Sequence, residues 1–156
     1  MGERPPYESY AAIMGTFFAG LGLTGWLARS RNRDPACHSW LDLAVLAAAT
    51  FKASRTLSHD EVTSFLREPF VRGHAHEGGE EPKPGGMEQA IGELITCSRC
   101  AGTWAAAGLT WTQVLAPRFG RILSWSLAAG GLNDFLQASF AALTAKANEL
   151  EERTGS

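Results

Sequence analysis

The sequence has little net charge of either sign. Fourteen lysine and arginine residues stand against 16 aspartate and glutamate residues, which gives a formal net charge of -2 over 156 residues. A nucleic-acid-binding domain needs a basic face, so this balance argues against nucleic acid as a partner. The length suits one domain with a substantial buried core.

Charge is missing altogether from long stretches of the chain. Residues 9–28 and 100–117 contain no charged side chain, and residues 122–145 contain one, Asp134. A further apolar stretch at 41–57 carries Asp42, Lys52 and Arg55. Crossing a bilayer takes roughly 17–25 predominantly apolar residues. We therefore predict an all-α fold, an integral membrane bundle of about four helices at 10–28, 39–57, 100–115 and 122–145. A soluble bundle rich in alanine is the alternative.

The N-terminus lacks the basic segment and the small-residue cleavage site of a secretory signal. We expect residues 1–8 to be a polar tail and the first helix to be retained as an anchor. Small residues recur in that helix at helical spacing, with Ala11, Gly15 and Ala19 on one stripe. Such stripes let a second helix approach closely in lipid. Besides the lipid bilayer, the predicted partner is therefore a second copy or another membrane protein.

A polar insertion interrupts the predicted membrane domain, which covers residues 9–145. Ser58 and Glu61 have the spacing of a capping box, and they predict a short interfacial helix that ends at Pro69. Residues 72–86 are rich in glycine, glutamate and proline, which predicts a mobile polar loop. Helical spacing returns at 87–95, and the polar segment 146–156 is expected to be a solvated tail.

The sequence offers no serine–histidine–acid set, no phosphate loop and no paired carboxylates above chance. It has three cysteines, and two of them, Cys97 and Cys100, form a CxxC pair at the start of an uncharged segment. Such a pair can form a disulfide, exchange thiols or bind zinc, or it can simply mark a tight turn. Zinc needs about four ligands, and the candidates to complete the set are Cys37 with His38, or His74 with His76.

Two motifs together resemble a family of small bacterial membrane proteins known as the domain of unknown function number thirteen-sixty. One motif runs over residues 49–70, and the other is the acid–CxxC–glycine–tryptophan run at 92–104. The chain departs from the usual member at Ser98 and Arg99, where we expect proline and an aromatic residue. The resemblance implies membrane residence and no established activity. It also groups these residues as one structural or interaction cluster: Arg55, Asp60, Thr63, Arg67, Pro69, Phe70, Glu93, Cys97, Cys100, Gly102 and Trp104.

The sequence thus predicts a multi-pass protein of the bacterial cell membrane with a structural or interaction role. We expect no catalytic residue and no resident cofactor. The alternative is a membrane thiol–disulfide or metal-binding protein that acts through Cys97 and Cys100. In that alternative zinc is the possible cofactor, and His74 and His76 would assist the two thiolates.

Overall fold

The computed structural model describes residues 5–32, 39–73 and 79–154, and its fold is all-α, as predicted. Nearly all of the described residues are helical, and the only strands in this part of the chain are two short ones. In chain order the elements are α1 (Tyr7–Ser30), α2 (Trp40–His59), η2 (Glu61–Thr63), α3 (Ser64–Arg67), β1 (Val71–Arg72), β2 (Glu81–Pro82), α4 (Gly86–Thr96), α5 (Ser98–Leu115) and α6 (Pro117–Thr154). The four predicted long helices are therefore present.

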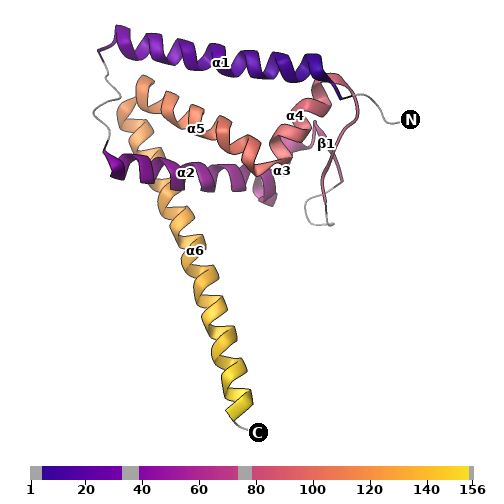
Figure 1. Cartoon of the computed structure of the whole chain (residues 1–156), viewed down its shortest axis with the longest axis vertical. Helices are drawn as coiled ribbons and strands as arrows, with labels where there is room; N and C mark the ends of the chain where they lie inside the picture. Colours follow the sequence, from indigo (N-terminus) through magenta and orange to yellow (C-terminus); the bar gives the residue numbers. More distant parts are fainter. Residues whose placement is uncertain (1–4, 33–38, 74–78, 155–156) are drawn as a thin grey trace.

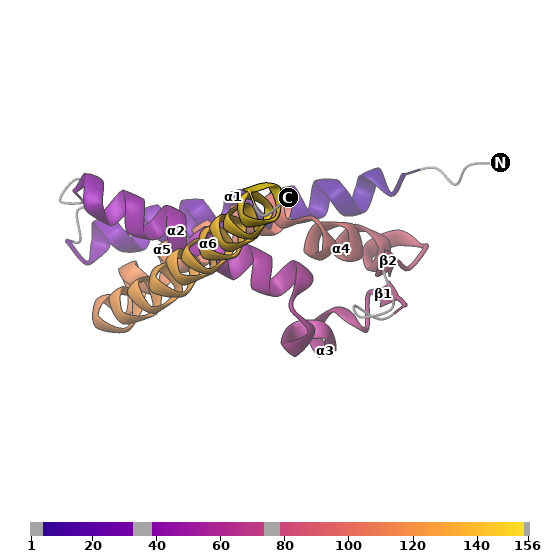
Figure 2. The ribbon, with the colours of Figure 1, turned by 90° about the horizontal axis from the view of Figure 1, so that it is seen from below.

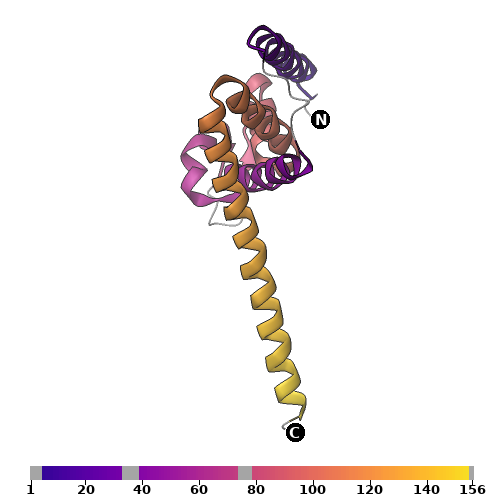
Figure 3. The ribbon, with the colours of Figure 1, turned by 90° about the vertical axis from the view of Figure 1, so that its left-hand side faces the viewer.

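Three of the long helices lie side by side as a layer in the order α1, α5, α2 (Figures 1 and 3). The 38-residue α6 crosses this layer over α2, and its C-terminal half projects away from the other helices. Seen from below, α4 and the two strands lie at the end of the layer opposite the turn between α5 and α6 (Figure 2). The CxxC pair, which joins α4 to α5, therefore lies at the α4 end.

Small residues allow α2, α5 and α6 to pack closely where they cross. The buried core consists of Ala49, Leu109 and Ala128, one from each helix. A side chain at Gly131 would come within 3.1 Å of the Ala48 carbonyl oxygen, so α6 lies almost directly on the α2 backbone there. Gly120 has a similar role in the α5–α6 turn, because a Cβ would lie 2.5 Å from the Gln113 backbone nitrogen.

α1 forms the edge of the layer and contacts it through a few residues. Phe17 packs edge-on against Trp104 at 5.2 Å, and the Trp111 indole donates a hydrogen bond of 3.2 Å to the Gly20 carbonyl. Among the described residues, α1 is the one helix long and apolar enough to cross a membrane. Only 11% of its most apolar window is buried. The other predicted spans do not meet that test, so the expected four-helix membrane bundle is not supported.

Three local predictions differ from the structure. The capping box is formed by Ser39 and Asp42 at the start of α2, whereas Ser58 is a buried residue inside that helix. The predicted interfacial helix is the shorter pair η2 and α3. The polar segment from residue 146 to 154 continues α6 as a helix instead of leaving it as a tail.

The two ends of the predicted mobile loop differ from the expectation. Its ends form an antiparallel pair of strands in which Val71 faces Pro82 and Arg72 faces Glu81. Residues 74–78, with His74 and His76, lie outside the described residues.

Much apolar surface is left exposed. The accessible surface is 11022 Å², against about 7,600 Å² expected for a compact monomer of this mass. Exposed apolar side chains lie on α1, at the start of α2, on η2 with α3 and along α6. Exposed apolar side chains on these elements include Phe18, Trp26, Trp40, Val62, Phe65, Ile122, Phe140 and Leu143.

Candidate functional site: a thiol pair beside a buried arginine

The thiol pair lies at the junction of two helices. Cys97 is the residue between α4 and α5, in an extended backbone conformation, and it occupies the N-cap position of α5. Cys100 lies in the first turn of that helix and is exposed, while Cys97 is partly covered. Both thiols are free, and their side chains form a hydrogen bond with each other. The predicted position of the pair at a helix entrance is confirmed.

The two sulfurs have different acidities because of their positions. The pKa of Cys97 is lowered, chiefly by the hydrogen bond from the Cys100 thiol, and also by the backbone N–H groups of Cys100 and Arg99 and by the Arg99 charge. These N–H groups face the sulfur at the helix N-terminus without forming a capping hydrogen bond. The pKa of Cys100 is raised by the same thiol–thiol hydrogen bond and by burial. Cys97 is thus the better nucleophile of the pair near neutral pH.

A histidine that sequence reasoning missed approaches this junction. The Nε2 atom of His59, the last residue of α2, lies 2.8 Å from the hydroxyl of Ser98, the first residue of α5. This contact fixes the end of α2 beside the CxxC pair. Nothing in the spacing of His59 along the chain singled it out, because the contact spans 39 residues.

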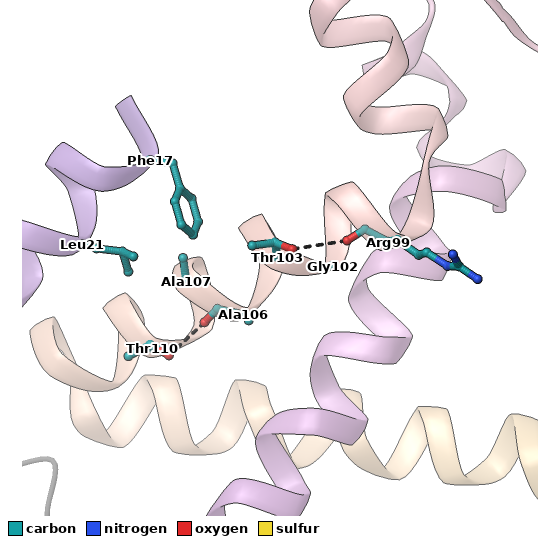
Figure 4. A pocket seen from close by; sticks show the side chains of 8 residues that line it. All are labelled: Phe17, Leu21, Arg99, Gly102, Thr103, Ala106, Ala107 and Thr110. Carbon is teal, nitrogen blue, oxygen red and sulfur yellow. Dashed lines mark hydrogen bonds between the residues drawn. The ribbon is translucent and has the colours of Figure 1, made fainter. Parts of the chain in front are cut away.

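An open pocket of about 660 Å³ runs between α1 and α5, next to the thiol pair (Figure 4). Phe17 and Leu21 line it from α1, and Gly102, Ala106 and Thr110 are among the residues that line it from α5. Arg99 lies at one end of the pocket, and its side chain points away from Phe17 (Figure 4). The two threonine hydroxyls in the pocket bond to the backbone of their own helix, at Arg99 and Ala106. The pocket therefore offers mainly apolar surface.

A buried arginine organises the segment between α2 and α4. The Arg67 side chain is wholly buried and pairs with Glu80, with Nε 2.5 Å from the carboxylate and Nη2 at 3.1 Å. Its Nη1 donates to the carbonyls of Leu57 and Asp60 and to the Thr63 hydroxyl, at 2.7–3.1 Å. We call Arg67, Glu80 and Thr63, with these two carbonyls, the arginine node. Its guanidinium is satisfied on every side, as a buried charge requires.

The strands and α4 complete this end of the molecule. Lys83 donates two hydrogen bonds of 2.9 Å to the carbonyls of Glu68 and Pro69, and its backbone N–H bonds to the Phe70 carbonyl. Gly92 of α4 packs on the same carbonyl, and a Cβ there would lie 2.6 Å from the Phe70 oxygen. The glycine thus lets α4 lie directly on the chain that leaves α3.

Glu93 connects α4 to the edge helix α1. Its carboxylate accepts hydrogen bonds from the Tyr10 hydroxyl and from the Gln89 amide, the latter at 2.9 Å. Tyr10 had not been singled out in the sequence. Together with the Phe17–Trp104 contact, this bond holds the N-terminal half of α1 against the site.

Because an unpaired charge in an apolar helix is costly, the sequence predicts that Arg55 pairs with Asp60 or Glu93. The structure shows other partners. Arg55 does not reach Asp60 or Glu93: its guanidinium lies over the Phe51 ring, 5.9 Å from the centroid. The pair that forms joins Lys52 of α2 to Asp134 of α6 at 2.9 Å. Both residues line a cleft of about 430 Å³ with Arg55 and Asp60, beside the stacked rings of Phe51 and Phe135.

The predicted cluster is therefore several connected groups, not one site. Asp60, Thr63 and Arg67 meet in the arginine node, while Pro69 and Phe70 bind Lys83. Glu93, Cys97, Cys100, Gly102 and Trp104 follow one another along α4 and α5, with Gly102 against Ser54 of α2. Within the described ranges no three histidine, cysteine or acidic side chains gather as metal ligands.

A family model for a protein of unknown function (DUF1360) matches residues 45–140. The chain belongs to this family. The match confirms the resemblance drawn from the two motifs. The region that matches DUF1360 starts within α2 and ends within α6, and it contains both the thiol pair and the arginine node. α1 and the last turns of α6 lie outside it.

Two curated proteins of Bacillus subtilis (strain 168) are similar to this DUF1360 chain. One is "Sporulation protein YjcA", 30% identical over 109 residues, which cover 62% of this chain and 88% of that protein. The other is "UPF0713 protein YngL", 24% identical over 103 residues, which cover 65% of this chain and 79% of that protein. No solved structure matches the chain.

Proposed function

We propose that this DUF1360 protein is a membrane-associated protein with a structural or interaction role, attached to the bilayer through α1. The observation that carries the proposal is the combination of an uncharged 20-residue stretch in α1 with the small buried share of that helix. Apolar side chains on it, such as Met14, Phe18 and Trp26, are more than half exposed. Leaving such a helix in water would cost about 25 cal/mol for each Å² of apolar surface.

The position of α1 agrees with attachment at one edge. It lies on the side of the layer farthest from the projecting end of α6 (Figures 1 and 3). Arg29 and Arg31 at its C-terminal end favour the cytoplasmic side of a membrane for that end. Gly15, Gly22 and Gly25 have open space at the Cβ position, so this face of α1 is free to meet a partner helix in lipid.

Carbonate extraction of cells that express the full chain tests the attachment. We expect the protein in the membrane pellet, and we expect Met14→Asp with Phe18→Asp to move it to the aqueous fraction, because carboxylates in a membrane helix are costly. Ala145→Asp, which places one carboxylate on exposed α6, is the matched control and should stay in the pellet. Recovery of the unaltered chain in the aqueous fraction would overturn the proposal.

A second candidate function, thiol–disulfide exchange, is favoured by the unequal acidities of Cys97 and Cys100. The Cys97 thiolate would attack a partner disulfide, form a mixed disulfide and release one partner thiolate. Cys100, once deprotonated, would attack the Cys97 sulfur and release the second partner thiolate. The Cys97 and Cys100 thiols give up two electrons as they form their disulfide, and these two electrons reduce the partner disulfide to two thiols.

Mass measurement after alkylation, with and without reductant, tests this candidate. In a protein that cycles through the Cys97–Cys100 disulfide, reduction before alkylation should add two alkyl groups to those gained without reductant. A Cys97→Ser, Cys100→Ser variant should lose the exchange. Metal analysis of the same sample distinguishes zinc binding from thiol exchange. One equivalent of bound zinc would point to a thiolate metal site. If the double variant functions normally, the thiols are not needed for function and the structural role is the one that remains.

A further inference from the structure

The C-terminal half of α6 carries an apolar stripe that is largely exposed in the described part of the chain. Leu136, Phe140, Leu143 and Leu150 are 61%, 73%, 70% and 50% exposed. They belong to a helix whose end projects away from the layer (Figure 3). The stripe is distinct from the small-residue face of α1, from the thiol pair and from the pocket between α1 and α5.

The spacing of these residues is that of a coiled coil. Asn133, Phe140 and Ala147 fall at a positions and Leu136, Leu143 and Leu150 at d positions, in alternating steps of three and four over residues 133–150. A strict repeat of this kind makes a narrow seam that faces one partner helix. Leucine at every d position suits a two-stranded coil, and Asn133 is the single polar a residue that fixes register in such coils.

The charges beside the seam indicate what the partner is. In this register Lys146 is a g residue and Glu151 is the e residue five positions later. Two parallel copies would place Lys146 of each against Glu151 of the other, twice per dimer. An antiparallel pair over the same residues would instead place Lys146 opposite the uncharged g residue Ser139, so this attraction would be absent. Within one copy Lys146 contacts Glu149, a c residue outside the seam, at 2.8 Å.

We propose that residues 133–150 of α6 form a parallel, in-register two-stranded coiled coil with a second copy of this chain. The proposal does not rest on membrane attachment, because the seam lies on the part of α6 most remote from α1 (Figure 1). Most of the seam lies at the end of the DUF1360 match or beyond it, since that match stops at residue 140.

Light scattering of the full chain in detergent micelles measures the oligomeric state. We expect the mass of a dimer, and the mass of a monomer for Leu136→Asp with Leu143→Asp. Ala145→Asp adds a carboxylate to the same helix at an f position, opposite the seam, and should remain dimeric. A monomeric unaltered chain, or a dimer that survives the double substitution, would overturn the proposal.

The charged pair gives a test that does not depend on core packing. Lys146→Glu should weaken the dimer at least several-fold, and Lys146→Glu with Glu151→Lys should restore it. No rescue in the double variant would show that these residues do not face each other across the seam.

Cross-linking decides the orientation. In a full chain with Cys37, Cys97 and Cys100 replaced by serine, Leu136→Cys and Leu150→Cys should each give disulfide dimers with mild oxidation. Ala145→Cys should not. Dimers only from a mixture of the two cysteine variants would indicate an antiparallel coil, and protection of both cysteines from aqueous reagents would place the stripe in lipid. Either result refutes the proposal.

Discussion

The side chains of Cys97 and Cys100 are only three positions apart, yet their surroundings push their acidities in opposite directions. Cys97 receives a hydrogen bond from its neighbour and lies at the N-terminus of α5, where partial positive charge favours a thiolate. Cys100 donates that hydrogen bond, and donating it raises the pKa of Cys100. The chemistry of the pair therefore depends on which sulfur holds the proton between them.

We expect alkylation by iodoacetamide to reach its half-maximal rate at a lower pH for Cys97 than for Cys100. The lowered pKa leaves Cys97 as thiolate at a pH where Cys100 is still protonated. Cys100→Ala should move the Cys97 profile to higher pH, because the hydrogen bond from Cys100 is the largest cause of the lowering. Mass spectrometry of labelled peptides across a pH series measures both curves. Identical profiles for the two residues would contradict the geometry.

The arginine node is the other residue-scale feature with a sharp consequence. We expect Glu80→Gln to lower the free energy of unfolding by about 3–5 kcal/mol, because it leaves the buried Arg67 charge without its counter-ion. Glu149→Gln is the matched control. It breaks two ion pairs on exposed α6 and should cost at most about 1 kcal/mol. Denaturant titration of both variants measures the difference, and equal midpoints would refute a structural role for the node.

The sequence identified Arg67 but not Glu80, and the reason is physical. Glu80 lies in a run of glycine, glutamate and proline that has no apolar periodicity, so composition alone predicts disorder there. The carboxylate becomes ordered only because the chain turns back on itself through β1 and β2 and reaches a guanidinium 13 residues away. Pairing of this kind depends on tertiary contact and leaves no local signal.

At the scale of elements, the long helices could be predicted because their uncharged runs are continuous. The residues at which those helices end, and the side chains that pair between them, could not be predicted. Ser58 with Glu61 and Ser39 with Asp42 have the same spacing, and only burial of Ser58 inside α2 decides between them. Lys52 and Asp134 both stand in apolar stretches of the sequence, but their pairing follows from the way α6 crosses α2.

The close packing of α4 gives a prediction at this scale. We expect Gly92→Ala to destabilise the protein by about 1–3 kcal/mol, since the new methyl would overlap the Phe70 carbonyl. Gly108→Ala is the control. It makes the same change inside α5, where nothing lies within 4 Å of the Cβ position. That variant should be stabilised by up to about 1 kcal/mol through helix propensity. Thermal unfolding followed by circular dichroism separates them, and equal shifts would contradict the packing described.

At the scale of the whole molecule, the chain has two ends with different surroundings. α1 offers a nearly uncovered apolar helix at one edge, and α6 offers a narrow apolar seam on a projecting arm. The family match covers what lies between them, residues 45–140. The thiol pair and the arginine node thus belong to the part shared with the family. Both exposed surfaces lie mainly outside the matched residues.

This division predicts that the residues after Phe140, at the projecting end of α6, can be removed without destabilising the other helices. In a chain that stops after Phe140, α6 retains Gly131, Asp134 and Phe135, which pack on α2. Compared with the monomeric Leu136→Asp, Leu143→Asp variant, its free energy of unfolding should therefore differ by no more than about 0.5 kcal/mol. The truncated protein should still be recovered in the carbonate-resistant pellet, and by light scattering it should be a monomer. A large loss of stability would mean that residues beyond 140 pack on the helical layer, which contradicts the exposure of Leu143 and Leu150.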